Sequence, residues 1–599
     1  MNYRERLLHQ MSNVGKAYRR YPLTMLLLIL LTLTNTWNII DEFSGYEAIV
    51  HGLLLGIALT LVASHLNERF IQDRTKQLAL FILSFLLSIG YYFLLPPNDA
   101  YYFIAEVRTG VLVFTLLVTF IWIPSIKNAQ ESFYQYFLAA FKYAFTTILY
   151  ALILTIGVQA ILSTIDYLFF NIDYDYFLHT SNIIWFIFAT SYFLSLLPET
   201  NRYVETDRTA VKHDETIENN AFEITKFLKI LISYIVIPLI AIYTIILLVY
   251  IALNITGEFW TDNLLEPMLI SYTIILILVY LLASNIEDPI TNFFRKVFPK
   301  ILIFIVIFQT MASLLKIREI GISYGRYYVI LFGVFSLIAG LIFSFLPKER
   351  SGLIVPVLIV LSLVSLTPPI DAFTVAEKSQ KNLLTETLTE NGMLEENTIF
   401  KTKEISQKDK EKITSAVEYL EMHDYIEELA YLPKDFETYD DFEQVFGFPM
   451  TYDESQVDDD NFYQYASLDR SDGQVMDISE EDYFVELFIE NYEEVSTVET
   501  IQINPDYFVQ INNKNRYPRI VIENEIGDIV LEIDLENLFE KAFAANPIAD
   551  GMLNQDQMTL IVENEELVAR VLAYELMQNE SEEDEIISAQ VYLFIQLKD

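Results

Sequence analysis

Long apolar runs separated by short polar stretches fill the first 370 residues of the chain and then stop. Each run can cross a bilayer as a helix, because the hydrocarbon core needs about 20 apolar residues. Only helices and closed barrels satisfy the backbone hydrogen bonds in lipid. The pattern therefore predicts an all-α polytopic transmembrane bundle of about 11 helices. The runs lie at residues 23–40, 46–66, 77–96, 101–123, 136–162, 178–197, 227–253, 265–284, 297–316, 327–346 and 352–369.

The positions of lysine and arginine between these runs give the bundle an orientation. With the N-terminus in the cytoplasm, the inner stretches hold nineteen of these residues and the outer stretches hold three. We expect this orientation because basic residues gather on the cytoplasmic side of membrane proteins. The three outer ones all lie in KIREIGISYGRYY, residues 316–328. An odd number of spans then places residues 371–599 outside the cell.

Some residues inside the spans predict how the helices meet. Gly52 and Gly56 are four residues apart, the spacing that allows two membrane helices to approach closely. Pro238, Pro299 and Pro356 also lie within spans. We expect each proline to kink a helix or end a turn, with neighbouring helices supplying the missing hydrogen bonds.

The pattern changes after residue 370 and predicts an α+β, strand-rich soluble domain over residues 371–599. Apolar residues at helical spacing first predict helices at 373–391 and 408–424. Alternating and β-branched segments then predict strands, with a hairpin turn at Asn524 to Asp528 and a short helix at 535–543. The segment 566–577 fits either a helix or a strand. The predicted strands lie at 500–503, 507–511, 519–524, 528–533, 558–564 and 589–597.

The charge of the chain is concentrated in this last third. Residues 371–599 hold 55 acidic and 15 basic residues, a net charge of −40, out of −42 for the whole chain. A domain of this charge repels nucleic acid and anionic lipid headgroups, so we expect no nucleic-acid partner. The chain has no cysteine, which excludes disulfides, iron–sulfur sites and thiol nucleophiles.

Candidate metal ligands do not form a recognisable site. No two of the six histidines have the spacing of ligands on one helix face. The acidic run DESQVDDD at 453–460 has oxygen ligands that calcium prefers, but it lacks the glycine and spacing of a calcium-binding loop. A solvated loop is the alternative. We predict neither a metal nor another cofactor.

Asp41 and Glu42 lie in the first outer loop. They resemble the acidic pair that polytopic lipid-linked glycosyltransferases carry there and use for acid–base or metal chemistry. Such enzymes usually have a longer first loop than this chain. We keep the pair as an alternative catalytic site.

Charged residues near the outer membrane boundary form the second candidate site. A charge within the bilayer is unfavourable, so each needs a partner or access to water. One interpretation is structural: the groups pair and seat the exported domain on the bundle. The other is a binding site for a headgroup or anion, in which the arginine guanidinium groups form paired hydrogen bonds with phosphate or carboxylate. The members of this outer-boundary polar cluster are Glu106, Arg108, Lys316, Arg318, Glu319 and Arg326.

The order of several segments resembles a bacterial membrane family known as domain of unknown function 4153. The resemblance covers roughly residues 20–400 and implies a polytopic bacterial inner-membrane protein with no assigned catalytic residues. In that family the pattern Gly321–Arg326–Tyr327 recurs. The segments that carry the resemblance are WIPSIKNAQESFYQY (122–136), YFLSLLPE (192–199), SYIVIPLIAIYTIILLVY (233–250), REIGISYGRYYVILFGVF (318–335) and VAEKSQKNLL (375–384).

Three functions are compatible with these patterns. The favoured one is a non-enzymatic envelope protein of the bacterial cell membrane, whose external acidic domain binds or senses a surface partner. The second is a transporter or lipid-handling protein, for which Gln159 and Gln309 would have to contribute to a polar path. The third is a glycosyl- or phosphotransferase that uses Asp41 and Glu42. The oligomeric state is left open.

Overall fold

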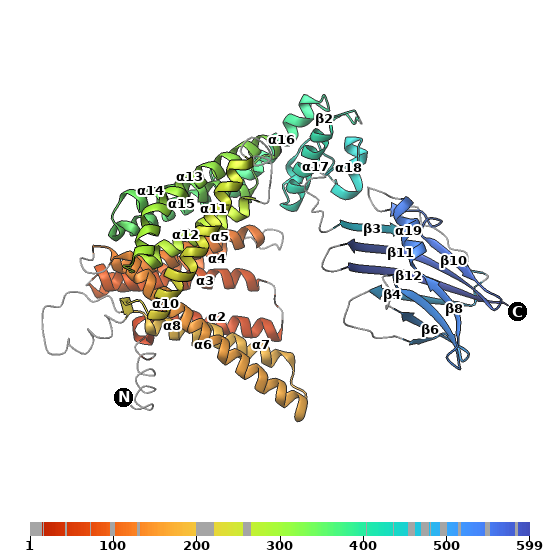
Figure 1. The fold of residues 1–599 in the computed structure, drawn as a ribbon, viewed down its shortest axis with the longest axis horizontal. Helices are drawn as coiled ribbons and strands as arrows, with labels where there is room; N and C mark the ends of the chain where they lie inside the picture. Colours follow the sequence, from red (N-terminus) through yellow and green to blue (C-terminus); the bar gives the residue numbers. More distant parts are fainter. Residues whose placement is uncertain are drawn as a thin grey trace. The chain divides into compact units, whose positions relative to one another are not determined.

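In a computed structural model, the chain folds into two compact units (Figure 1). The membrane unit comprises residues 1–386 and 416–430, and the C-terminal unit comprises 387–415 and 431–599. The boundary passes through helices α16 (Ala372–Glu390) and α17 (Gln407–Met422). The structure describes residues 15, 17–41, 43, 45–71, 73–95, 102–127, 132–198, 221–254, 265–402, 404–434, 436–452, 462–468, 478–479, 481–490, 500–512, 517–545, 552–580 and 585–598.

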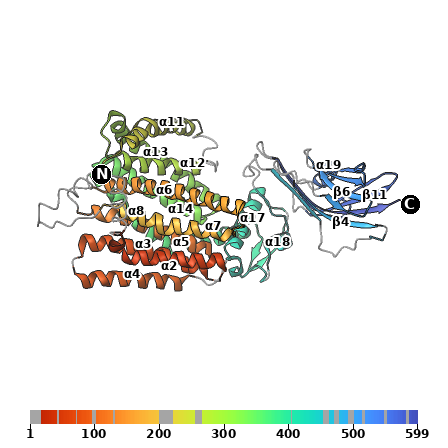
Figure 2. The same cartoon turned by 90° about the horizontal axis from the view of Figure 1, so that it is seen from below.

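The membrane unit is built from long apolar helices, many of which run side by side (Figure 2). Ten helices in the described part are long and apolar enough to cross a membrane, and each coincides with a predicted run. The run at 265–284 forms a shorter apolar helix, Pro267–Ala283. The prediction of a multi-pass helical bundle is therefore confirmed. Its helices before α16 are α2 (Pro22–Ile40), α3 (Tyr46–Phe70), α4 (Arg74–Leu94), α5 (Tyr102–Trp122), α6 (Phe133–Leu168), α7 (Tyr174–Asn182), α8 (Thr190–Leu196), α10 (Lys226–Ile230), α11 (Ile237–Asn254), α12 (Leu265–Ala283), α13 (Pro289–Ile320), α14 (Tyr324–Phe345) and α15 (Ile354–Leu366).

Two spans change their winding part of the way along. Residues Ile183–Ala189 between α7 and α8, and Leu231–Val236 between α10 and α11, form π-helix. Short 3-10 turns, η2 (Ile123–Ser125) and η6 (Lys348–Leu353), follow α5 and precede α15. A π-helical turn widens the helix locally and changes the direction of the side chains in it.

The predicted small-residue contact is confirmed between α3 and α4. A Cβ atom on Gly56 would lie 2.5 Å from Ser88 Oγ and 2.9 Å from Ser88 Cβ. Ser88 Oγ also donates a hydrogen bond of 2.7 Å to the Gly52 carbonyl oxygen. The absence of a side chain at Gly56 thus allows the two helices to pack closely enough for this bond.

The C-terminal unit contains a helical part and a larger β-sheet part. Its helix α18 (Thr438–Phe446) packs Phe442 and Phe446 against Phe448. A six-stranded sheet has the order β4-β12-β11-β3-β9, with β10 also paired to β11, and a four-stranded sheet has the order β5-β6-β7-β8. Helix α19 (Glu536–Ala545) joins both sheets in one apolar core. The strands of these two sheets are β3 (Phe462–Leu468), β4 (Tyr483–Glu490), β5 (Thr500–Gln502), β6 (Tyr507–Asn512), β7 (Arg519–Asn524), β8 (Ile529–Asp534), β9 (Met552–Leu553), β10 (Thr559–Glu563), β11 (Leu567–Glu580) and β12 (Glu585–Leu597).

These elements confirm the predicted α+β, strand-rich domain. Each predicted strand is present, as are the helix at 535–543 and the turn at Asn524, whose Oδ1 accepts from the Ile526 and Asp528 amides. The ambiguous segment 566–577 belongs to strand β11. Strands β3, β4 and β9 and helix α18 were not predicted. The acidic run 453–460 lies outside the described residues.

Candidate functional site

A tight turn joins α13 to α14 within the stretch 316–328. Helix α13 ends at Ile320, and Gly321 follows with a φ of 69°, a backbone conformation that favours glycine. Ser323 then begins α14, because its side chain accepts a hydrogen bond from the Arg326 amide. The turn therefore presents several main-chain groups at this end of the bundle.

Helix α16 binds these main-chain groups. The Ser379 hydroxyl accepts a hydrogen bond of 2.9 Å from the Ile322 amide. The buried side chain of Gln380 donates from Nε2 to the Ile320 carbonyl oxygen at 3.0 Å and to that of Ile322 at 3.3 Å. A Cβ atom on Gly321 would lie only 2.9 Å from Gln380 Nε2. Glycine at 321 is thus required both for the turn and for the close approach of α16.

Tyr324 connects the turn to two further elements of the membrane unit. Its amide donates to the Tyr419 hydroxyl oxygen at 3.1 Å. Its ring stacks on Phe373 with the ring centres 5.5 Å apart and meets Phe103 of α5 edge-on at 5.2 Å. Burial raises the pKa of Tyr419 to about 12, so its hydroxyl stays protonated at neutral pH.

Arg108 and Asp371 form an ion pair between α5 and the start of α16. Arg108 Nη2 lies 3.1 Å from Asp371 Oδ1, and the Asp371 side chain is fully buried. Oδ1 also accepts from the amides of Phe373 and Thr374, so Asp371 is the N-cap of α16. Burial alone would raise the pKa of Asp371, but hydrogen bonds from Thr374 and Arg108 hold it below its ordinary value. The carboxyl group is therefore charged.

We call Arg108, Tyr324, Asp371, Gln380 and Tyr419 the helix seat. Together they fix α16 and the end of α17 to the beginnings of α5 and α14 through charged and neutral hydrogen bonds. The arrangement holds helices in place.

A buried histidine lies beside the helix seat. The ring of His423 is 4.6 Å from that of Tyr419 and 5.6 Å from that of Tyr324, and its Nε2 has no hydrogen-bond partner among the residues that the structure describes. Burial lowers the pKa of His423, although the Asp424 charge acts in the opposite direction. The imidazole is therefore neutral at neutral pH.

Lys381 forms a second charged contact in the same part of the membrane unit. Its Nζ lies 2.7 Å from Glu377 on α16 and 2.5 Å from Glu428. Burial alone would lower the pKa of Lys381, but the two carboxylates raise it above its ordinary value. This ion pair joins α16 to the segment after α17.

The outer-boundary polar cluster is only partly brought together. Arg108 pairs with Asp371, whereas Glu106 is exposed. Lys316 lies in the last turn of α13 and Arg326 in the first turn of α14, both partly buried. The side chains of Arg318 and Glu319 lie outside the described residues, as does Glu42, while Asp41 is exposed at the end of α2.

Sequence reasoning missed the residues that complete the helix seat. Asp371 lies two residues before the predicted helix at 373–391, so an acidic N-cap close to the start of that helix was a readable signal. Gln380 and Tyr419 have no comparable signal, because their partners are 58 or more residues away in the chain.

Two further polar clusters brace the membrane unit. In the first, Arg20 forms two hydrogen bonds with Glu68, at 2.6 and 2.8 Å, and reaches the Leu197 carbonyl at 3.0 Å. Beside it, buried His65 contacts the Tyr21 hydroxyl at 3.0 Å.

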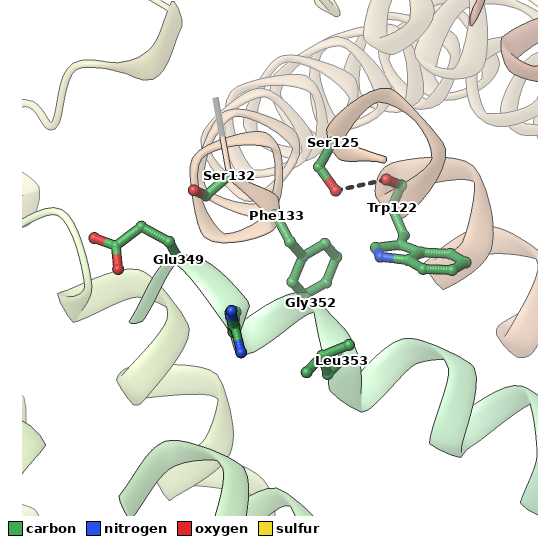
Figure 3. A pocket seen from close by; sticks show the side chains of 8 residues that line it. Trp122, Ser125, Ser132, Phe133, Glu349, Gly352 and Leu353 are labelled. Carbon is green, nitrogen blue, oxygen red and sulfur yellow. Dashed lines mark hydrogen bonds between the residues drawn. The ribbon is translucent and has the colours of Figure 1, made fainter. Parts of the chain in front are cut away.

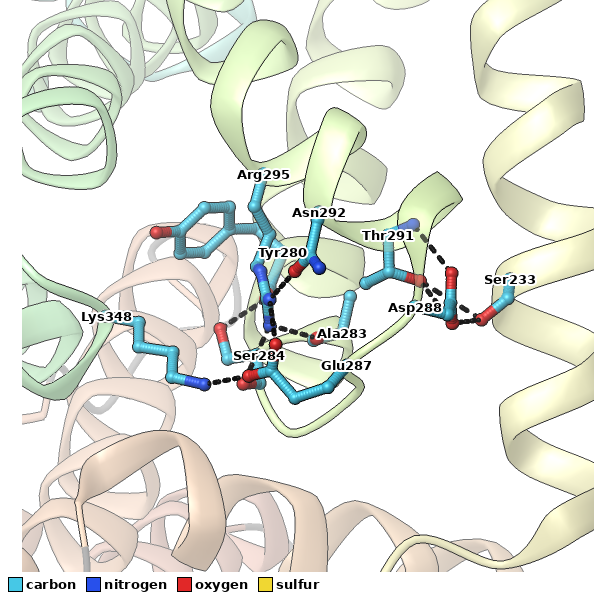
Figure 4. Close-up of polar contacts among 10 residues, drawn as sticks. All are labelled: Ser233, Tyr280, Ala283, Ser284, Glu287, Asp288, Thr291, Asn292, Arg295 and Lys348. Atoms are coloured by element: carbon cyan, nitrogen blue, oxygen red, sulfur yellow. Dashed lines mark hydrogen bonds and ion pairs between the residues drawn. The ribbon is translucent and has the colours of Figure 1, made fainter.

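The second cluster surrounds the connection between α12 and α13 (Figure 4). Arg295 donates to the carbonyl oxygens of Ala283 and Ser284, each at 2.9 Å, and caps the end of α12. Lys348 pairs with Glu287 at 2.6 Å. Asp288 begins α13 and accepts a hydrogen bond of 2.8 Å from Ser233 in the π-helical turn, so the cluster joins α12 and α13 to that turn and to η6.

A pocket of about 340 Å³ lies between η2, the start of α6 and η6 (Figure 3). A Cβ atom on Gly352 would lie 2.8 Å from Phe133 Cβ and 3.2 Å from Trp122 Nε1. Glycine there lets η6 approach α6 closely. The pocket is lined by Trp122, Ser125, Ser132, Phe133, Glu349, Arg350, Gly352 and Leu353.

No group of three or more potential metal ligands occurs in the described part of the chain. Neither a curated protein nor a solved structure matches the sequence. The model of one family, domain of unknown function (DUF4153), matches residues 24–390, which include every helix-seat residue except Tyr419 and all the membrane helices except the start of α2. The chain therefore belongs to the DUF4153 family.

Proposed function

We propose that this chain is a non-enzymatic protein of the bacterial cell envelope that displays an acidic binding domain outside the cell membrane. The membrane unit is the anchor in this proposal. The C-terminal unit supplies the binding surface.

The helix seat is the observation that carries the proposal. A ligand site at this end of the bundle would need charged groups free to bind an anion. Arg108 instead has Asp371 as a partner, and Gln380 and Tyr419 bind main-chain groups of the 320–324 turn. These contacts support the structural interpretation, in which polar residues here hold the helices that lead to the acidic domain.

The six-stranded sheet offers a surface for a partner. Phe484, Glu486 and Phe488 alternate along β4 and therefore lie on the same face. Both phenylalanines are 57% exposed. Tyr592 packs against Phe484 with the ring centres 5.5 Å apart, and the Tyr574 hydroxyl donates to Glu486 at 3.2 Å. We call these five residues the aromatic–acidic face.

Its chemistry favours a cationic partner. Aromatic rings and carboxylates attract lysine and arginine side chains, and the net charge of −40 over residues 371–599 adds a long-range attraction. Exposed aromatic residues on an otherwise charged surface commonly mark an interaction site. We therefore propose that the partner presents a lysine- or arginine-rich segment.

The test is a titration of the full chain, held in nanodiscs of neutral lipid, with a fluorescent lysine-rich peptide. The double variant Phe484→Ser/Phe488→Ser keeps the net charge, and we expect it to weaken binding by about tenfold or more, as loss of central aromatic contacts does. The control is Ile526→Ser, which removes an exposed apolar side chain from the hairpin turn. Equal affinity of the double variant and the control would mean that net charge alone attracts the peptide, and would reject the face as a site.

A further inference from the structure

Two lysines lie on a lipid-facing surface of α13. Lys296 and Lys300 are four residues apart, so they share one face of the helix. Both are exposed, and so are the apolar side chains of Phe293 and Phe304 on the same helix. The exposed phenylalanines mark this face as one that meets lipid in the membrane.

A groove runs beside these lysines. It has a volume of about 400 Å³, and its walls are mainly apolar. Residues of α13 form most of it, and Leu248 of α11 contributes the facing wall. The lining residues are Leu248, Lys296, Val297, Lys300, Ile301 and Phe304.

The neighbouring Arg295 shows how a basic residue of this helix is satisfied within the protein. It binds the carbonyl oxygens of Ala283 and Ser284 and the Glu287 carboxylate. Lys296 and Lys300 have no ion pair with any acidic residue in the described ranges. Their charge on a lipid-facing surface therefore lacks compensation from the described part of the protein.

We infer that the groove binds one anionic phospholipid, with its phosphate at Lys296 and Lys300 and an acyl chain along Ile301 and Phe304. Basic pockets between membrane helices on the cytoplasmic side recognise such headgroups. Lys296 and Lys300 lie near the beginning of α13. The distribution of basic residues predicts that this end of the helix is on the cytoplasmic side, in agreement with the inference. The apolar walls fit the acyl chain, and the lysines fit the phosphate.

Native mass spectrometry of the full chain in neutral detergent tests this inference. Phosphatidylglycerol and phosphatidylcholine are added in turn. Two lysines near a headgroup predict a preference of about 30-fold for phosphatidylglycerol. We expect Lys296→Gln/Lys300→Gln to lose this preference, and Lys296→Arg/Lys300→Arg to keep most of it.

The control removes two basic residues elsewhere on the surface. Arg74→Gln/Lys76→Gln also removes two positive charges, from exposed side chains at the start of α4. This variant should retain the preference for phosphatidylglycerol. Equal binding of the two lipids to the unaltered protein would overturn the inference, whether or not the glutamine variant folds. Binding of inorganic phosphate as tight as that of phosphatidylglycerol would also overturn the inference, because the acyl chain would then contribute nothing to affinity.

Discussion

Asp371 begins helix α16 and also pairs with Arg108 of α5, at 3.1 Å, so one buried carboxylate both starts a helix and ties it to the bundle. The two residues are 263 positions apart in the chain. The pair joins the first half of the membrane unit to the segment that follows the last span. The contribution of this pair can be separated from that of the helix cap.

Asp371→Ala removes the helix cap and the ion pair together. We expect it to destabilise the membrane unit by about 3 kcal/mol, from about 1 kcal/mol for the cap and about 2 kcal/mol for a charge-assisted hydrogen bond. Asp371→Asn keeps a capping oxygen and should cost about half as much. Thermal unfolding in detergent gives both values. Equal stability of the alanine variant and the unaltered protein would show that the pair does not hold α16.

Gln380→Leu tests the neutral part of the helix seat. The leucine leaves the carbonyl oxygens of Ile320 and Ile322 without their donor, and we expect a loss of about 1–3 kcal/mol. Faster hydrogen exchange at residues 320–324 would locate the effect. Lys378→Leu is the control, since Lys378 is exposed on the same helix. If both variants exchange at the rate of the unaltered protein, Gln380 has no part in fixing the turn.

Because His423 is buried, we expect the folded protein to lose stability in acid. Burial lowers its pKa in the folded protein below the ordinary value of about 6.5, so the unfolded chain binds the proton more readily. Its contribution is fully present above about pH 6.5 and decreases as the pH falls below that value. His423→Phe should therefore show a smaller fall in melting temperature between pH 7.5 and 5.5. An identical fall in both proteins would contradict this role.

Gly56→Ala tests the contact between α3 and α4. The new methyl group would overlap Ser88 Cβ, which rotation of the Ser88 side chain cannot move away. We expect a loss of about 1–3 kcal/mol, as for other overpacked sites. Gly90→Ala on α4 meets open space and is the matched control. A melting temperature equal to that of the control would show that the helices can move apart at little cost.

The membrane spans could be predicted because lipid imposes a simple rule on each helix separately. A run such as 227–253 must be predominantly apolar over about 20 residues to remain in the bilayer. Strand β4 follows no such rule. Its sequence YFVELFIE is a short apolar segment that fits several structures equally well.

Strand β11 shows a second limit of pattern reading. A bulge shifts its register between Ala573 and Glu575, and this shift interrupts the alternation by which a strand is recognised. The helix seat was predicted only in outline. A charge at Arg108 indicates that a partner is needed, but the partner, Asp371, is brought near by the fold of the whole unit.

The central proposal is that the chain displays its acidic C-terminal domain on the outer side of the membrane. Since the chain has no cysteine, a single introduced cysteine can be labelled without background. Asp528→Cys places it in the exposed hairpin turn of the C-terminal unit, and Lys76→Cys at the start of α4 is the control for the inner side. With a membrane-impermeant maleimide on intact cells, we predict that Asp528→Cys is labelled and Lys76→Cys is not. Labelling of Asp528→Cys only after the cells are made permeable would place the acidic domain inside and contradict the account.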